Sequence, residues 1–255
     1  MNTTVTDVTD TPALAHDEAM RLQSVEFERT NALLRSLSDD DWSRHVPACP
    51  DWDIRQMYLH VLGASEAGAS MKENMHQMRL AKKHRKVHGG PLEAGLSNVQ
   101  VREREHLTPD ELVTKMAAIA PITIKKRTKL PALMRRANLA IDGPVHETWK
   151  LGYLVGTIYL RDMWMHRVDT SDVTGRELVL TADHDGRIIA DVVAEWARRH
   201  GQPFRLTLTG PAGGDFVGSD PPADVAPIEL DAVEFCRTVG GRVDGAGLLA
   251  TVVPF

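Results

Sequence analysis

The spacing of apolar residues changes near Gly175, and this change constrains the fold more than any other feature of the chain. Before Gly175, apolar residues recur every three or four positions, as they do along one face of an α-helix. After it, residues 204–209 alternate apolar and polar side chains, which is typical of a β-strand. The pattern predicts an α+β protein with three parts: a flexible tail of residues 1–14, a helical bundle of residues 15–175, and a small α/β domain of residues 176–255.

Four segments of the first half carry helix signals, and together they predict a four-helix bundle. One begins at the cap residue Asp53, and another begins at Thr108, which is followed by a proline and two acids. The expected helices cover residues 15–37, a stretch from 53 past 78, a stretch from 108, and residues 148–170. The expected inward face of the second helix consists of Met57, His60, Ala64, Ala67, Met71, Met75 and Met78.

The α/β domain is expected to contain short elements separated by turns. The glycine-rich residues 210–214 indicate a turn, and they lack the Lys-Ser or Lys-Thr that completes a phosphate-binding loop. The expected elements are an extended segment over 177–180, strands over 204–209, 228–230 and 248–253, and helices over 182–200 and 232–239.

Asp162 and His166 are the residues of the helical region that most strongly suggest chemistry. They are four positions apart, so they project from the same helix face, and that face is otherwise apolar. A buried aspartate costs several kcal/mol unless it has a partner such as a cation. His60 lies on the inward face of another helix and can complete a site of two imidazoles and one carboxylate, which leaves coordination positions open. Asp169, one turn further along, can orient a ligand imidazole.

A purely structural interpretation fits the same residues, and spacing alone leaves both interpretations open. A single histidine on an apolar face is often a hydrogen-bonded core residue, and an aspartate four positions before a histidine is a short motif. His76, His84 and His88 fall in a lysine-rich stretch, which we interpret as a solvated helix end, with a second metal site as the alternative. Cys49 stands between two prolines and is interpreted as a turn residue, because no histidine is evidently paired with it.

The composition argues against several classes of protein. A net charge of −5 gives no general attraction to nucleic acid, and the basic runs 82–86 and 125–127 lack interleaved aromatic residues, so we interpret them as solvated faces. No stretch approaches the roughly 18 consecutive apolar residues of a membrane-spanning helix. Two cysteines in different predicted domains fit a reducing compartment. We therefore expect a cytoplasmic protein that binds neither nucleic acid nor membranes.

Several segments in order resemble one known family. They are residues 34–42 (LRSLSDDDW), 46–52 (VPACPDW), 60–63 (HVLG), 161–169 (RDMWMHRVD), 210–214 (GPAGG) and 240–242 (GGR). Together they resemble the mycothiol-dependent maleylpyruvate isomerase family, a branch of the DinB-like metal-binding bundles. The resemblance implies a DinB-like four-helix bundle followed by a small, sterol-carrier-protein-like α/β domain.

The resemblance also implies a site and a reaction. It implies a divalent ion, expected to be zinc, held by His60, Asp162 and His166, with mycothiol as the thiol cosubstrate. In such a reaction the thiolate adds to the double bond of maleylpyruvate, the new single bond rotates, and elimination gives fumarylpyruvate. The family usually has glutamate where Asp162 stands and glycine where Asp51 stands, so the ligand carboxylate reaches one methylene less far.

A dianionic substrate requires cationic side chains, and Arg242 is the expected catalytic residue, acting as an anion clamp. Arg237 lies nearby in the same domain, whereas Arg161 and Arg167 flank the ligand helix and are expected to solvate it.

Three alternative functions stay open at the level of sequence. The first is a mycothiol S-transferase that stops after addition to an electrophile, and the second is a non-catalytic metal-binding or small-molecule-binding protein. The third is a metal-dependent oxygenase with the same ligand set. The expected partners are a small-molecule substrate and a low-molecular-weight thiol, and both a monomer and a homodimer are compatible with the sequence.

Overall fold

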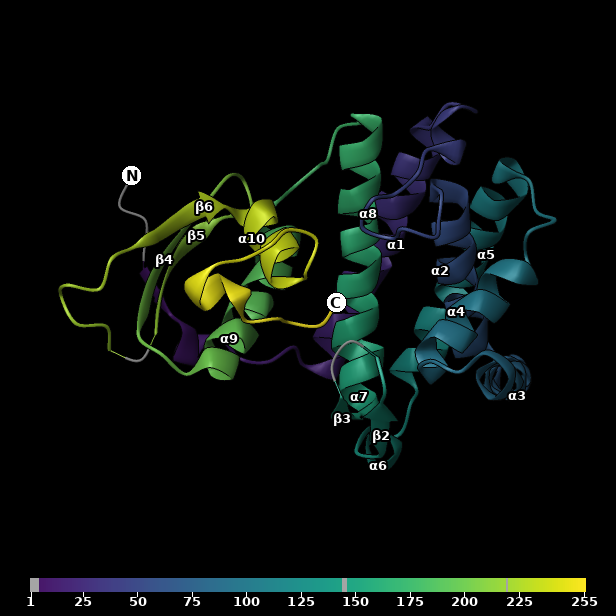
Figure 1. The fold of residues 1–255 in the computed structure, drawn as a ribbon, viewed down its shortest axis with the longest axis horizontal. Helices are drawn as coiled ribbons and strands as arrows, with labels where there is room; N and C mark the ends of the chain where they lie inside the picture. Colours follow the sequence, from purple (N-terminus) through teal and green to yellow (C-terminus); the bar gives the residue numbers. More distant parts are fainter. Residues whose placement is uncertain (1–4, 144–145, 219) are drawn as a thin grey trace. The chain divides into compact units, whose positions relative to one another are not determined.

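The computed structural model describes residues 5–143, 146–218 and 220–255, and the chain divides into two compact units. One unit is formed by residues 16–177, and the other combines residues 5–15 with residues 178–255. Figure 1 shows a helical unit and a mixed sheet with its own helices, so the fold class is α+β as predicted. None of the helices in the described ranges is long and apolar enough to cross a membrane.

The helical unit contains eight α-helical segments and one β-hairpin within the described residues (Figure 1). The helices are α1 (His16–Ser36), α2 (Ile54–Ala69), α3 (Met71–His88), α4 (Leu92–Arg102), α5 (Pro109–Thr128), α6 (Ala132–Arg135), α7 (Leu151–Tyr153) and α8 (Tyr159–Thr174). The hairpin pairs β2 (Asn138–Ile141) with β3 (Glu147–Lys150) in antiparallel register. A wider, π-helical turn, Leu154–Ile158, connects α7 to α8.

Caps set the beginnings of α2 and α5, as the sequence predicted. The Asp53 side chain accepts a hydrogen bond from the backbone N–H of Gln56, whose side chain accepts one from the backbone N–H of Asp53. Thr108 and Glu111 form the same reciprocal pair at the start of α5. Each pair satisfies two backbone donors that a helix start otherwise leaves exposed.

The core of the helical unit forms where α1, α2, α5 and α8 pack together. Apolar side chains from all four helices are buried in it, including Phe27, Ile54, Met57, Leu112, Met116 and Met163. Removing this apolar surface from water is the main stabilising contribution to the unit. It also fixes α2 and α8, the two helices that carry the predicted ligands.

The expected single helix from residue 53 past Met78 was wrong. Ser70 adopts extended backbone angles (φ −137°, ψ 118°), which end α2, and its side chain caps α3 by accepting from the N–H of Glu73. Met71 and Met75, expected in the core, are 66% and 60% exposed, because the change of direction turns their face toward solvent. The inward face therefore holds only as far as Ser70.

Two elements of the helical unit were not predicted. Helix α4 supplies buried side chains between α2 and α3, and the β2–β3 hairpin takes residues 147–150 out of the helix expected over 148–170. Gly175, with φ 67°, ends α8 in the left-handed conformation that glycine adopts most readily.

The α/β unit is built on a four-stranded mixed sheet of order β1-β5-β4-β6. Its elements are β1 (Val5–Asp7), β4 (Phe204–Thr209), β5 (Gly214–Gly218), β6 (Ile228–Asp231), α9 (Arg187–His200) and α10 (Ala232–Val239). β4 and β5 are antiparallel, whereas β1 pairs parallel to β5 and β6 pairs parallel to β4. Trp196, Phe204 and Phe235 are buried together, with ring centroids 4.9 and 5.4 Å from that of Trp196.

Two expectations for this unit need correction. Residues 5–7 form strand β1 rather than part of a flexible tail, because they pair with residues 215–217; residues 1–4 of that tail lie outside the described residues. The segment expected as a strand over 248–253 instead begins with a short 3-10 turn, Gly247–Ala250. Residues 177–180, expected to be extended, belong to no strand or helix in the described part of the chain.

Candidate metal centre

His166 lies at the middle of the candidate site. Its side chain projects from α8 into the helical unit, where the residue is only 4% exposed. Nε2 lies 3.3 Å from Oδ1 of Asp162, one turn before it, and Nδ1 lies 3.8 Å from Oδ2 of Asp169, three residues after it. Neither ring nitrogen has a partner with hydrogen-bond geometry among the described residues. A buried imidazole in this state is unusual, since most buried polar groups are hydrogen-bonded.

His60 reaches the same place from α2. Its ring is nearly perpendicular to that of His166, with centroids 6.1 Å apart. One potential ligand atom from each of His60, Asp162 and His166 lies within 4.8 Å of the others. The structure therefore brings the three predicted residues together, with Asp162 partly exposed and His166 buried.

A chain of side-chain amides holds the His60 ring from behind. Nδ1 of His60 lies 2.7 Å from Oε1 of Gln100 on α4, and Nε2 of Gln100 donates to Oε1 of Gln77 on α3. Gln77 in turn donates to the backbone carbonyl of Gly63. If Nδ1 carries the proton given to Gln100, Nε2 of His60 has its lone pair available for a cation. The sequence analysis missed this support because it did not predict α4.

The two imidazoles have opposite electrostatic environments in the metal-free protein. Burial lowers the pKa of His60, which favours the neutral ring that a metal requires. Burial also disfavours charge on His166, but the neighbouring Asp162 carboxylate outweighs it and holds the pKa of that ring well above 6.5. A cation bound at Nε2 of His166 would take the place of this proton beside Asp162.

Arg127 supplies a positive charge in the neighbourhood of Asp162. The basic run that contains it was expected to be solvated, but its side chain is buried, lies 4.4 Å from the centre of the Tyr159 ring, and donates to Oε1 of Gln23. Burial lowers the pKa of Arg127 to about 10, against the opposing effects of Tyr159 and Asp162. At neutral pH the guanidinium is therefore still charged.

The expectation that Arg161 and Arg167 solvate their helix was wrong. Both side chains are buried. Nε of Arg167 lies 2.6 Å from Oε1 of Glu26 on α1, so this arginine joins α8 to α1 within the core. Removing one member of such a buried pair leaves an uncompensated charge, which costs about 3–5 kcal/mol.

Comparison with known protein families finds a match in the helical unit. A family profile described as the mycothiol maleylpyruvate isomerase N-terminal domain matches residues 24–171, which is more than half of the chain. The chain belongs to this family. No curated protein matches the chain.

Two solved structures share the fold of this family member. Both are crystal structures of the mycothiol-dependent maleylpyruvate isomerase, one of them a single-residue mutant. The mutant aligns at 15% identity over 94% of this chain and 93% of the other, with a TM-score of 0.56. The second aligns at 16% identity over 94% of both chains, with the same TM-score. At these identities the likeness shows the fold alone.

Cys49 lies beside the candidate metal centre, and the sequence analysis did not predict this. The backbone N–H of Cys49 donates to Val46, and the N–H of Trp52 donates to Cys49, so its position in a turn is as expected. However, its thiol, a nitrogen of His166 and an oxygen of Asp169 lie within 4.8 Å of one another. The partner histidine is 117 positions away in the chain, so no local pattern could indicate it.

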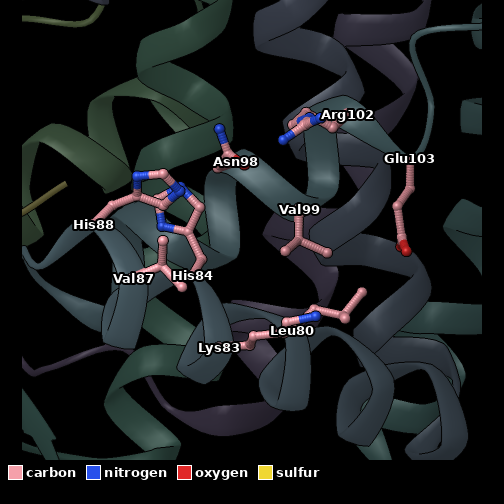
Figure 2. Close-up of a pocket in the computed structure, with 9 residues that line it drawn as sticks. All are labelled: Leu80, Lys83, His84, Val87, His88, Asn98, Val99, Arg102 and Glu103. Atoms are coloured by element: carbon pink, nitrogen blue, oxygen red, sulfur yellow. The ribbon is translucent and has the colours of Figure 1, made fainter.

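The described residues of the helical unit enclose cavities near the candidate histidines. One of about 740 Å³ borders the metal centre through Cys49 and Trp52, and the Trp52 ring centroid lies 5.1 Å from that of His60. Another, of about 410 Å³, lies between α3 and α4. Figure 2 shows His84 and His88 side by side in it, with ring centroids 4.5 Å apart. Among the described residues, no third histidine, cysteine or carboxylate joins them to form a metal-binding group.

The predicted anion clamp belongs to the α/β unit. Arg242 follows the end of α10, where its Nη1 donates to the backbone carbonyl of Gly240. Its part in binding a substrate stays a prediction.

Proposed function

We propose that this chain is a metal-dependent enzyme that uses mycothiol and acts as a maleylpyruvate isomerase or a close relative of one. The observation that carries the proposal is the buried His166 ring, which faces Asp162 and His60 and whose nitrogens have no hydrogen-bond partner among the described residues. Family membership supports the same conclusion.

The donor set suits a catalytic divalent cation. His60, Asp162 and His166 offer two imidazoles and one carboxylate, a set that zinc accepts and that leaves coordination positions open for a ligand. With Oε1 of Gln100 accepting from the Nδ1–H of His60, Nε2 of His60 would be the ligand atom. The Asp162 side chain is 30% exposed, which gives the site access to solvent.

A zinc ion held there would act as a Lewis acid that lowers the pKa of a bound thiol. The thiol sulfur of the cosubstrate would add to the double bond of maleylpyruvate, and rotation about the new single bond followed by elimination would return the thiol and release the trans isomer. Arg127, charged and close to Asp162, would attract the anionic substrate from within the helical unit. Arg242 is the second proposed anion-binding residue.

The same site also supports a mycothiol S-transferase, in which the reaction stops after addition to an electrophile. A non-catalytic metal-binding protein is the remaining alternative, and the open coordination positions argue against it. Use of a reduced low-molecular-weight thiol places the protein in the cytoplasm.

The test compares metal content and mycothiol binding in the wild type and in a His60→Ala, Asp162→Ala double variant. After zinc reconstitution and removal of excess metal, we expect about one tightly held zinc per wild-type chain, and calorimetry should detect mycothiol binding. The double variant should lose mycothiol binding and the zinc that depends on His60 and Asp162. His106→Ala, which removes an exposed histidine, is the matched control.

Two outcomes would contradict the proposal. Either the wild type holds no zinc after reconstitution, or the double variant keeps both zinc and thiol binding. If both properties depend on the trio, assays of maleylpyruvate and of model electrophiles then separate the isomerase from the transferase.

A further inference from the structure

His166 has two faces, and only one of them belongs to the proposed catalytic site. Nε2 faces Asp162, whereas Nδ1 faces Asp169 on the next turn of α8. Both nitrogens lack a hydrogen-bond partner in the described part of the chain, although the residue is only 4% exposed. The Nδ1 face therefore also has an unsatisfied ligand atom.

Cys49 completes a second donor set on that face. The turn between Val46 and Trp52 brings its thiol close to α8, where Cys49, His166 and Asp169 each offer a ligand atom within 4.8 Å of the others. Asp169 is buried and Cys49 is half-buried, so the set is largely shielded from water. These donors come from two elements far apart in the sequence.

A cysteine beside a buried histidine is not by itself a site, because the thiol can simply pack against the ring or donate a weak hydrogen bond to it. The orphan Nδ1 is the independent observation that points to a ligand. A thiol that donated to Nδ1 with good geometry would have satisfied this nitrogen, and Asp169 at 3.8 Å is beyond hydrogen-bond distance.

We propose that Cys49, Asp169 and Nδ1 of His166 form a second binding site, for a thiophilic divalent metal ion such as zinc. The thiol proton would be released to solvent as the sulfur binds the ion. One thiolate, one imidazole and one carboxylate leave the fourth tetrahedral position open, and Cys49 also lines the cavity of about 740 Å³ through which an ion could enter. A neutral imidazole offers one lone pair to a metal, so the ring proton would lie on Nε2, facing Asp162, while Nδ1 binds this ion. The two sites of His166 would therefore be filled alternately, and the second can be tested without the first.

Cobalt(II) alone is the probe, because cobalt bound to a thiolate gives an intense charge-transfer absorption in the near ultraviolet that imidazole and carboxylate ligands do not give. The His60→Ala, Asp162→Ala variant is titrated with cobalt, since it retains Cys49, His166 and Asp169. We expect the band to appear and to saturate at one equivalent. Adding Cys49→Ser should abolish it, and Asp169→Asn should weaken cobalt binding.

The controls separate this site from other sources of the band. Cys236→Ser, which changes the second cysteine of the chain, should leave the band unchanged. Circular dichroism checks that the double variant is folded. The wild type is titrated with excess cobalt in parallel, so that the test does not depend on the variant alone. Absence of the band in both proteins, or a band that survives Cys49→Ser, would overturn the proposal. Failure of the proposed function would instead appear as mycothiol binding that does not depend on His60 and Asp162.

Discussion

The two sides of the metal centre hold their histidines by different means. On the α2 side, the His60 ring is fixed through Gln100 and Gln77 by side-chain hydrogen bonds that run from α4 to α3. On the α8 side, Tyr58 donates to the backbone carbonyl of His166, but the ring itself has no hydrogen bond in the described structure and lies between carboxylates. One imidazole is thus preorganised by hydrogen bonds, and the other is positioned by packing and charge.

The largest effect that tests this comparison is expected at His166. Replacing His166 with alanine removes a ligand from both donor sets. Mutating a residue that only hydrogen-bonds to a ligand lowers metal affinity by up to about 100-fold, so the loss of His166 itself should lower it by more. His60→Ala should abolish the tight site but leave cobalt binding at Cys49. Isothermal titration with zinc and cobalt measures both. Equal behaviour of the two variants toward both metals would show that the two faces of His166 are not distinct.

The next effect tests whether hydrogen bonds preorganise the α2 side. Gln100→Leu removes the acceptor beside Nδ1 of His60, so zinc affinity should fall about 10–100-fold. Gln77→Leu, which acts one link further away, should cost less. A competitive chelator titration gives the affinities. If the Gln100 variant binds zinc as tightly as wild type, the amide chain does not orient the ligand.

A smaller effect is expected from crowding the same side. A Cβ at Gly63 would lie 2.6 Å from Cβ of Gln100, so Gly63→Ala must displace α4 from α2. Overpacking of this kind costs about 1–3 kcal/mol, which a urea titration of the metal-free protein detects. Gly90→Ala is an unsuitable control, because Gly90 has a positive φ of 80°, so Ala64→Ser on α2 serves instead. An unchanged free energy of unfolding in Gly63→Ala would mean that the space beside Gln100 is not required.

The smallest effect is a difference in the pH dependence of metal-free stability. The pKa of His166 is raised in the folded state, so its contribution is present below pH 6.5 and is lost as pH rises through the folded pKa. The pKa of His60 is lowered, so its contribution is present above pH 6.5 and is lost as pH falls toward the folded pKa. Melting temperatures with chelator should therefore decline less above pH 6.5 in His166→Gln, and less below it in His60→Gln. If the plots of melting temperature against pH for both variants run parallel to that of the wild type, the two pKa shifts are contradicted.

The sequence predicted the parts of the site that lie on regular, strongly patterned helices. Spacing on an apolar helix face singled out His60, Asp162 and His166, and the family resemblance favoured them as metal ligands over core residues. The structure brings the three side chains together. Gln100 was missed because α4 is short and weakly patterned, and Cys49 was set aside because its histidine partner is distant in the chain. Such contacts depend on tertiary packing, which local sequence does not encode.

The fold shows the same division between local and distant signals. The caps at Asp53 and Thr108 were correct because they act within one turn. The break at Ser70 also has a local signal, since Ser70 and Glu73 have the spacing of a helix start, and the sequence analysis missed it because the apolar pattern continues past this point. Strand β1 was missed because its partner, β5, lies more than 200 positions away.

That pairing of β1 with β5 makes the α/β unit discontinuous in the chain, with the helical unit inserted between residues 15 and 178. On the ribosome, residues 16–177 emerge complete while residues 5–7 still lack the strand that they will pair with. The helical unit, with both of its donor sets, can therefore fold and take up metal before the sheet closes.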